Sequence, residues 1–260
     1  MSSSPLFRVD DLHVRSTDET PRAVSREVLQ GLDFAVDPGE LHAIIGPDGS
    51  STSALGATLM GSPEFEVTSG TITFQGDDVT DWPVDERAKA GMFLAFRSPQ
   101  EIPGVSVIQF LRRALSARQR VDLSVLDMRL ATIDWMQRIG IDPSFVDRCL
   151  DDGFSPVDTQ CHEIVQMAVL EPELAILDQT DSDLDIDALR IVSQGIRAIR
   201  AARESIGVVL VTHHLRLLHE VSPDHVHILL DGRIVERGGI ELAEHVEQHG
   251  YDAFTSTVAV

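Results

Sequence analysis

The sequence feature that most restricts the fold is a short apolar run followed by a loop of glycine and serine. The run Leu41–Ile45 stops at Gly46, the loop continues to Ser53, and a helical stretch covers Ala54–Met60. A compact apolar run bounded by glycine is typical of a buried strand. A glycine-rich loop between a strand and a helix can present backbone N–H groups to a phosphate, although such turns are more often plain loops. The unit predicts a protein that mixes strands and helices.

The rest of the chain divides into a strand-rich part, a helical part and an alternating part. The periodicity predicts strands over Leu6–Val9, Val28–Val36, Thr71–Phe74 and Met92–Phe96, and a short helix over Asp85–Ala90. Apolar residues then recur at helical spacing, which predicts helices over Gln109–Gln119 and Leu126–Ile139. Helices and strands alternate over His162–Leu170, Leu174–Leu177, Asp187–Ala202, Val208–Val211 and Leu215–Glu220, which indicates parallel strands. A hairpin over His225–Leu230 and Arg233–Val235 precedes a last helix, Ile240–His249.

Composition excludes several classes of protein. The chain has 260 residues, of which 43% are apolar, and a formal charge of −21, which opposes binding to nucleic acid or acidic lipid. Its two cysteines, Cys149 and Cys161, are too few for a disulfide scaffold, so we expect a reducing, cytoplasmic setting. No run of 18 apolar residues and no secretion signal occurs, so we expect no membrane span. One domain over residues 1–260, with a helical subdomain inserted at about 96–160, fits this pattern.

Four segments together resemble the SufC family of ABC-type ATPases, the cytosolic ATPase subunits of iron–sulfur cluster assembly. They are GPDGSSTSALGATLMG, FLAFRSPQEIPGVS, EIVQMAVLEPELAILDQTDSDLDIDALRIVSQG and VTHHLRLL, and the similarity extends from about Phe7 to Tyr251. The resemblance implies an α/β fold, the ABC-type nucleotide-binding domain, with a phosphate-loop, RecA-like core, an antiparallel β subdomain and an inserted helical subdomain. It also implies ATP and Mg²⁺ as ligands and SufB- and SufD-like scaffold proteins as partners. By family architecture, the partners dock on the helical lobe and on Arg97–Ser106.

The phosphate loop departs from the family pattern G-x-x-x-x-G-K-[ST] at two positions. Ser51 stands where the second glycine belongs, and Thr52 stands where lysine reaches the β- and γ-phosphates. Losing one charge-assisted contact of roughly 1.5–3 kcal/mol weakens nucleotide binding by about 10- to 150-fold. The nucleotide-binding residues that the resemblance implies here are Gly46, Pro47, Asp48, Gly49, Ser50, Ser51, Thr52, Ser53 and Ala54.

The run Leu174–Asp178 resembles the Walker B strand, whose final aspartate holds Mg²⁺ through water. Asp178 and Ser53 are therefore the implied Mg²⁺ ligands, and the alternative reading of Asp178 is an ordinary strand-end aspartate. Gln179 stands where the family has its catalytic glutamate. A glutamine can orient a water molecule but cannot accept its proton, and loss of a general base typically costs about 10²- to 10⁴-fold in rate.

The remaining family motifs are changed at most positions. The signature loop reads Phe154-Ser155-Pro156-Val157-Asp158, which keeps the serine and loses both glycines. Proline has no N–H to donate and valine resists glycine-like backbone angles, so only Ser155 and the start of the helix remain for a phosphate. Arg97 replaces the Q-loop glutamine and is a possible replacement cation. His213 matches the switch histidine, or is a structural histidine.

The other histidines and the cysteines predict no further site. His225 and His227 share one strand, but the sequence shows no nearby carboxylate or cysteine to complete a metal site, so we expect none. The resemblance assigns no iron–sulfur cluster ligands to this subunit, so Cys149 and Cys161 are expected to pack.

Three functions remain open from the sequence. The first is a degenerate SufC-family subunit that acts through a complex with scaffold proteins and binds ATP weakly or not at all. The second is a working or slow ATPase of the same machinery, in which Arg97 and Asp178 compensate for the lost groups. The third is a non-catalytic interaction protein that uses an ABC fold as a docking platform.

Overall fold

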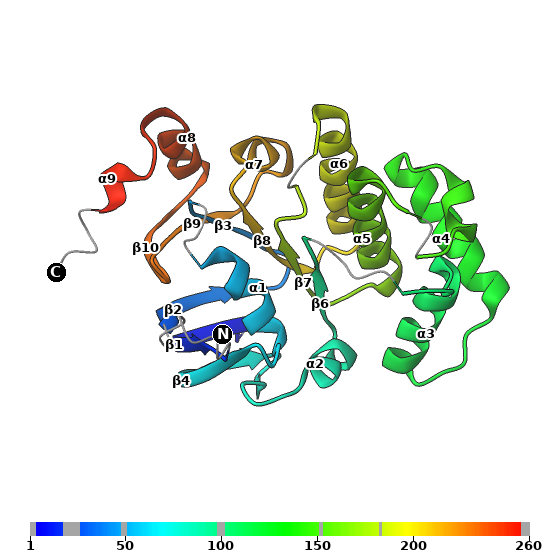
Figure 1. The fold of residues 1–260 in the computed structure, drawn as a ribbon, viewed down its shortest axis with the longest axis horizontal. Coiled ribbons are helices and arrows are strands. Elements are labelled where there is room, and N and C mark those ends of the chain that lie inside the picture. The colour runs from blue at the N-terminus through cyan, green and yellow to red at the C-terminus, as the bar shows by residue number, and fades with distance from the viewer. Residues whose placement is uncertain are drawn as a thin grey trace.

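Two β-sheets and the helices around them make up the part of the chain that the computed structural model describes, residues 4–17, 27–47, 51–97, 102–150, 153–181 and 184–255 (Figure 1). The larger sheet has the strand order β10 (Arg233–Gly238), β9 (His225–Leu230), β3 (Leu41–Ile45), β8 (Gly207–Thr212), β7 (Leu174–Asp178) and β6 (Met92–Ala95). Its strands are parallel except β10, which is antiparallel to β9. The smaller sheet is antiparallel, in the order β2 (Glu27–Val36), β1 (Phe7–Ser16), β4 (Phe65–Phe74) and β5 (Asp77–Asp78).

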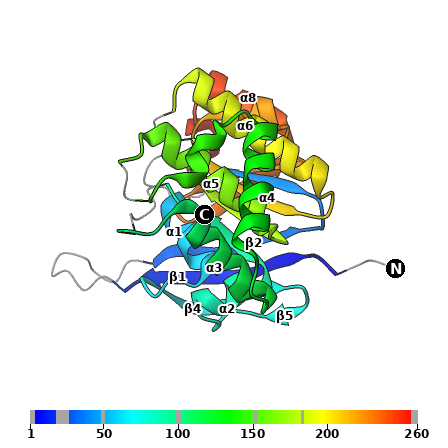
Figure 2. The same cartoon turned by 90° about the vertical axis from the view of Figure 1, so that its right-hand side faces the viewer.

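Helices cover both faces of the larger sheet. Helix α1 (Thr52–Met60) contacts β4 of the smaller sheet on one side and β6 and β7 on the other. The opposite face is covered by α5 (Pro156–Leu170), α6 (Ile186–Ala202), α7 (Leu215–Val221) and α8 (Ile240–His249). Figure 2 shows β1 and β4 at one side of the molecule and α8 at the other. A sheet covered on both faces explains why its strands are continuous apolar runs.

A helical lobe lies between β6 and β7 in the sequence and to one side of the larger sheet (Figure 1). It consists of α3 (Val107–Gln119), α4 (Val125–Ile139) and the short 3₁₀ helix η1 (Pro143–Asp147). Helix α3 begins at a capping box, in which Ser106 accepts from the N–H of Gln109 and Gln109 accepts from the N–H of Ser106. Two further helices are α2 (Val84–Ala90), before β6, and α9 (Asp252–Thr255), after α8.

Residues of β3 alternate between two hydrophobic cores. Leu41, Ala43 and Ile45 belong to the core under α5–α8, whereas Ile44 belongs to the core shared with α1 and the smaller sheet. His42 points with Ile44 toward the smaller sheet and is buried. The strand that leads into the phosphate loop is therefore held from both sides, and the one polar side chain within it is enclosed.

The predicted fold class is confirmed, and the main differences concern element ends. Strands β1 and β4 each extend over ten residues, longer than predicted, because polar side chains on their solvent face interrupt the apolar pattern. Helix α5 begins at Pro156, six residues before the predicted start, because Ser155 caps it. In the described residues, no helix is both long and apolar enough to cross a membrane.

Candidate functional site

Three strands of the larger sheet deliver candidate residues to one edge. Gly46 follows β3, Asp178 ends β7 and His213 follows β8. These strands are parallel and adjacent, with β8 paired to both β3 and β7, so their carboxyl ends meet at the same edge. The fold therefore brings together three of the residue groups that the sequence analysis singled out.

The phosphate loop is described at its two ends. Gly46 and Pro47 follow β3, whereas Asp48, Gly49 and Ser50 and the side chain of Ser53 lie outside the described residues. Ser51 precedes α1 with φ of 75°, in the left-handed region that glycine adopts easily, and its side chain makes no capping hydrogen bond. A serine in this conformation costs about 1 kcal/mol or more relative to ordinary backbone angles. The substituted glycine position thus keeps the backbone angle that a glycine would favour.

The position that the resemblance assigns to the loop lysine holds Thr52, which carries no charge. Thr52 is the first residue of α1, and it is only 6% exposed. Ala54, one turn into the helix, is equally buried, and its N–H donates to the carbonyl of Ser51 over 3.1 Å. A short buried hydroxyl side chain at this position cannot supply the charge-assisted contact that a lysine makes with a phosphate.

Asp178 has one buried oxygen atom without a partner. Its Oδ1 makes no hydrogen bond with the described residues, and burial raises the pKa of the carboxyl group to about 7, against a smaller lowering by the charge of Arg97. Helix α1 approaches closely, since a Cβ on Gly56 would lie 3.1 Å from that of Asp178. A desolvated carboxylate oxygen that lacks a donor suits a metal ion or a metal-bound water molecule.

Gln179 and Arg97 are joined at the end of β7. The Nη1 of Arg97 donates to Oε1 of Gln179 over 3.0 Å, and Gln179 is 5% exposed with φ of 51°. The N–H of Gln179 donates to the carbonyl of Val211, and the carbonyl of Arg97 accepts from Nε2 of Gln160. Two residues that depart from the family pattern therefore bind each other, next to Asp178.

A buried carboxyl group that the sequence analysis did not select lies near His213. Asp181 is 1% exposed, Thr212 donates a hydrogen bond to its Oδ2, and its Oδ1 has no partner. Burial raises its pKa, and the charges of His214 and His213 lower it. The rings of His213 and His214 are 4.1 Å apart. The spacing Asp178 to Asp181 just past a strand end is the signal that marks Asp181 as a candidate.

Ser155 lies at the exposed start of α5. Its side chain accepts from the N–H of Asp158 over 3.1 Å, and Asp158 accepts in turn from the N–H of Ser155. The guanidinium of Arg148 lies 3.3 Å from Asp158 and 4.4 Å from the ring centre of Phe154. The signature position is therefore a well-formed helix cap, which occupies the hydroxyl that a phosphate would otherwise use.

A groove lies between α1 and the helical lobe. It has a volume of about 670 Å³, and its lining includes Phe96, Ile102, Phe110, Phe154, Glu163 and Asp178. Phe96 is 51% exposed, and its N–H donates to the buried carboxyl group of Glu163, whose pKa is raised to about 7 by burial. Apolar side chains with a few buried polar groups make this groove suitable for a protein segment.

One expectation from the sequence is wrong. No carboxylate was expected beside His225, yet Glu40 and His42 lie next to it across the β3–β9 pair. Pairing of β3 with β9, which are 180 residues apart, creates this cluster, and no local pattern in the sequence shows that pairing. By contrast, Cys161 is buried, which raises the pKa of its thiol to about 11 and agrees with a packing role.

Comparisons with known proteins agree with this architecture. A family model described as ABC transporter matches residues 29–182. Vegetative protein 296 of Bacillus subtilis (strain 168) is 42% identical over 254 residues, which cover 97% of this chain and 94% of that protein. Probable ATP-dependent transporter ycf16 of Pyropia yezoensis is 41% identical over 259 residues, which cover 98% and 100% of the two chains.

Solved structures show the same fold at low sequence identity. The dimeric structure of MJ0796, a bacterial ABC transporter cassette, matches with a TM-score of 0.77 over 90% of this chain and 98% of that chain, at 17% identity. A nucleotide-free ATP-binding cassette from an ABC transporter matches with a TM-score of 0.70 over 98% and 99% of the chains, at 18% identity.

Proposed function

Because the chain belongs to the ABC transporter family, we propose that it is a degenerate, SufC-like member of that family. In this proposal it binds Mg²⁺·ATP weakly or not at all, hydrolyses it poorly, and acts in the cytoplasm in a complex with SufB- and SufD-like scaffold proteins of iron–sulfur cluster assembly. The printed names of its relatives support an ATP-dependent protein, and the four resembling segments support the narrower assignment.

The hydrogen bond between Arg97 and Gln179 is the observation that carries the proposal. A general base at the end of β7 needs a carboxylate that faces a water molecule. The only acceptor of the Gln179 side chain, Oε1, is instead engaged by Arg97 over 3.0 Å. The position therefore cannot accept a proton, and the Arg97 bond fixes its side-chain oxygen in one orientation.

The site fits Mg²⁺ better than it fits the triphosphate. Asp178 has an unpaired buried oxygen, so Asp178, together with Ser53 by resemblance, would hold Mg²⁺ bound to a nucleotide. Mg²⁺ would neutralise charge on the phosphates, and by the resemblance the backbone N–H groups of the loop would bind them. Thr52 adds no charge, and Gln179 adds no base. These residues support weak binding and no efficient hydrolysis.

The groove beside the helical lobe supports the scaffold role. Phe96 and Ile102 are exposed at its rim; Ile102 belongs to the Arg97–Ser106 stretch that family architecture assigns to the partner, and Phe96 directly precedes it. Exposed apolar side chains of this size at a groove are typical of a docking site. This role is independent of the nucleotide chemistry, so it can persist after the catalytic groups are lost.

Two assays on purified protein test the proposal. Calorimetric titration with Mg²⁺·ATP, repeated at high salt, should show no binding tighter than the millimolar range.

SufB- and SufD-like proteins from the same genome should bind the wild-type chain, and Phe96→Asp should weaken the complex at least about tenfold, because a charge is buried at the interface. Ile186→Asp, at a 58% exposed position at the start of α6 and outside the helical lobe, is the matched control and should leave binding unchanged. Equal binding by both variants contradicts docking in this groove.

A slow ATPase is the second candidate, and Asp178 supports it. Its unpaired oxygen is available to hold Mg²⁺, and the nearby positive charge of Arg97 is available to a phosphate. This candidate requires measurable Mg²⁺-dependent phosphate release, which the first proposal denies.

A further inference from the structure

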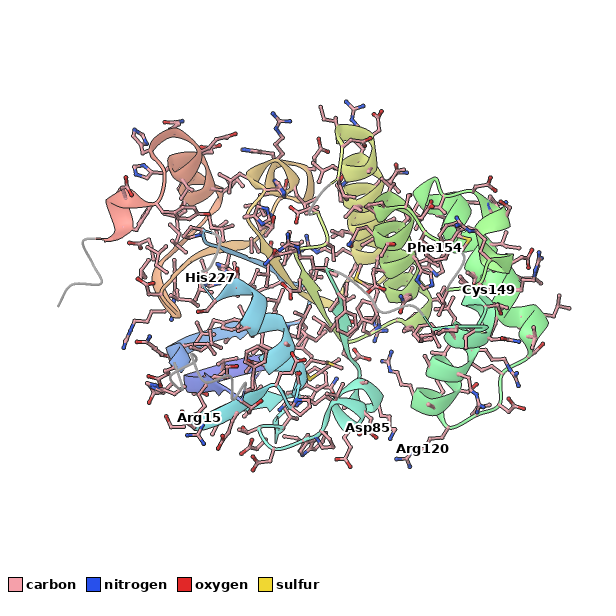
Figure 3. The ribbon with its side chains drawn as sticks, viewed as in Figure 1. Arg15, Asp85, Arg120, Cys149, Phe154 and His227 are labelled. Atoms are coloured by element: carbon pink, nitrogen blue, oxygen red, sulfur yellow. The ribbon has the colours of Figure 1, made fainter. Side chains whose placement is uncertain are left out.

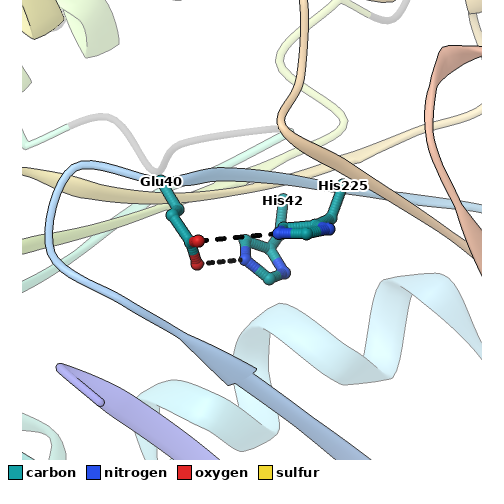
Figure 4. Close-up of side chains that lie close together, drawn as sticks. All are labelled: Glu40, His42 and His225. Atoms are coloured by element: carbon teal, nitrogen blue, oxygen red, sulfur yellow. Dashed lines mark hydrogen bonds and ion pairs between the residues drawn. The ribbon is translucent and has the colours of Figure 1, made fainter. Parts of the chain in front are cut away.

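Two histidines and a glutamate converge at the amino edge of the larger sheet, away from the nucleotide site. Glu40 precedes β3, His42 lies in β3 and His225 begins β9 (Figure 4). His42 and His225 are direct partners in the parallel β3–β9 register, so both side chains project from the same face. Figure 3 shows His227, the next histidine of β9, on the opposite side of the molecule from Phe154 in the signature loop.

The potential ligand atoms of these residues are close enough for one metal ion. Nε2 of His42 lies 2.9 Å from Oε2 of Glu40, and Nε2 of His225 lies 3.5 Å from Oε1 of the same carboxylate. One ligand atom from each residue lies within 4.8 Å of the others. Tetrahedral Zn²⁺ with bonds of about 2.0–2.1 Å separates its ligands by roughly 3.3 Å, so only small side-chain shifts are needed.

His227 orients the buried histidine of the cluster. Since a carboxylate only accepts, Nε2 of His42 donates to Glu40, and Nδ1 of His42 therefore accepts from Nε2 of His227 over 2.9 Å. A metal at Nε2 moves the ring proton of His42 to Nδ1, which then donates to His227. His227 must then accept at Nε2 and carry its own proton on Nδ1. Because Nδ1 of His227 has no partner among the described residues, this change breaks no other hydrogen bond. A second imidazole behind a metal-binding one is a common supporting group.

The surroundings of the cluster favour a cation and leave room for one more ligand. A cavity of about 270 Å³ opens beside it, lined by Phe34, Asp37, Glu40, His42, His225 and Arg237. The guanidinium of Arg237 donates a hydrogen bond to the carbonyl of Asp33. His42 is 3% exposed, and its ring is fixed by hydrogen bonds at both nitrogens, with Nε2 directed at Glu40.

We propose that Glu40, His42 and His225 bind one Zn²⁺ ion, with a water molecule from the cavity as the fourth ligand. Two imidazoles and one carboxylate form a donor set that Zn²⁺ commonly takes with a water molecule. The ion connects the first residues of β3 with the first residues of β9, on the face that packs near β2 of the smaller sheet. It therefore ties two neighbouring strands of the larger sheet together at the end opposite the phosphate loop.

Titration of Zn²⁺ into tag-free, metal-stripped protein tests this site by calorimetry. The wild-type chain should bind one equivalent, and zinc should raise its melting temperature. His225→Ala removes a ligand that is half exposed and should weaken zinc binding by at least about 100-fold, a loss at the upper end of what supporting residues alone cause. Glu40→Gln keeps the shape and the hydrogen bond from the N–H of Asp37, and should weaken binding similarly.

A matched histidine variant separates this site from other histidines. His245 and His249 stack on one helix, with ring centres 4.5 Å apart, and could themselves bind zinc. His249→Ala should leave the first equivalent of zinc unchanged. Absence of zinc binding by the wild-type chain, or equal affinities of the wild-type chain and both site variants, overturns the proposal. Far-ultraviolet circular dichroism of each variant establishes that the chain is folded.

Discussion

At the carboxyl edge of the larger sheet, Oδ1 of Asp178 is buried without a partner, whereas at the amino edge His42 uses both of its ring nitrogens. Both residues lie on the larger sheet, whose neighbouring strands β3, β8 and β7 are buried apolar runs and form one framework. The framework is set by apolar packing, which does not depend on the polar groups at either edge. One edge can therefore lose the groups that its ligand requires while the other edge keeps a complete polar cluster.

Repair of the carboxyl edge should have the largest effect. Thr52→Lys, Gln179→Glu, Pro156→Gly and Val157→Gly in one chain restore the phosphate cation, the base and the signature glycines. Phosphate release should rise about 10²- to 10⁴-fold above that of any single repair, because each missing group limits a different step. A colorimetric phosphate assay with Mg²⁺·ATP measures it. Rapid turnover by Thr52→Lys alone would show that the other positions are not limiting.

Removal of His42 should be costly because its polar atoms are satisfied. His42→Ala leaves a cavity and strips a hydrogen bond from buried His227, so we expect a loss of about 2–3 kcal/mol in the free energy of unfolding. Urea unfolding without metal measures this loss. His225→Ala, at a half-exposed position, is the control and should change stability by no more than about 0.5 kcal/mol. Equal losses for both variants contradict the difference in burial.

Removal of the Asp178 charge should stabilise the chain, whereas removal of His42 should destabilise it. In the folded state the pKa of Asp178 is raised from its usual 3.8 to about 7. Between these pH values the carboxyl group is protonated in the folded state and ionised in the unfolded state. The contribution of this carboxyl group to stability is therefore greatest below about pH 4 and falls up to about pH 7. Asp178→Asn should therefore stabilise the chain by about 1–2 kcal/mol at pH 8 and hardly at pH 4.5. Urea unfolding at both pH values measures this difference, with Asp187→Asn at an exposed position as the control. A gain in the free energy of unfolding that does not depend on pH would contradict the prediction.

Relief of the left-handed backbone should give the smallest gain. Ser51→Gly should stabilise the chain by about 0.5–1 kcal/mol, since φ of 75° suits glycine and no capping hydrogen bond is lost. Ser155→Ala is the informative counterpart, because that serine caps α5, and it should destabilise by about 1 kcal/mol. Thermal unfolding compares the two. A stabilising Ser155→Ala would show that the capping box contributes nothing.

The fold was predictable because the central strands of the larger sheet are fully buried apolar runs, and Leu41–Ile45, His225–Leu230 and Ile240–His249 have the predicted bounds. The residues at the carboxyl edge were also predictable, because each of them ends or closely follows a predicted strand in the sequence. Long-range pairings were not: neither the bond between Arg97 and Gln179 nor the approach of Glu40 to His225 has a local signal. Such contacts depend on which strands become neighbours and on where long side chains reach.

Single-turnover phosphate release, with the wild-type chain in excess over Mg²⁺·ATP, tests the central claim most directly. The bond from Arg97 to Gln179 and the burial of Thr52 predict that release does not exceed that of the Asp178→Asn blank over many minutes. Release within seconds, abolished by Asp178→Asn and comparable to that of the fully repaired chain, would contradict a degenerate site and establish a working ATPase.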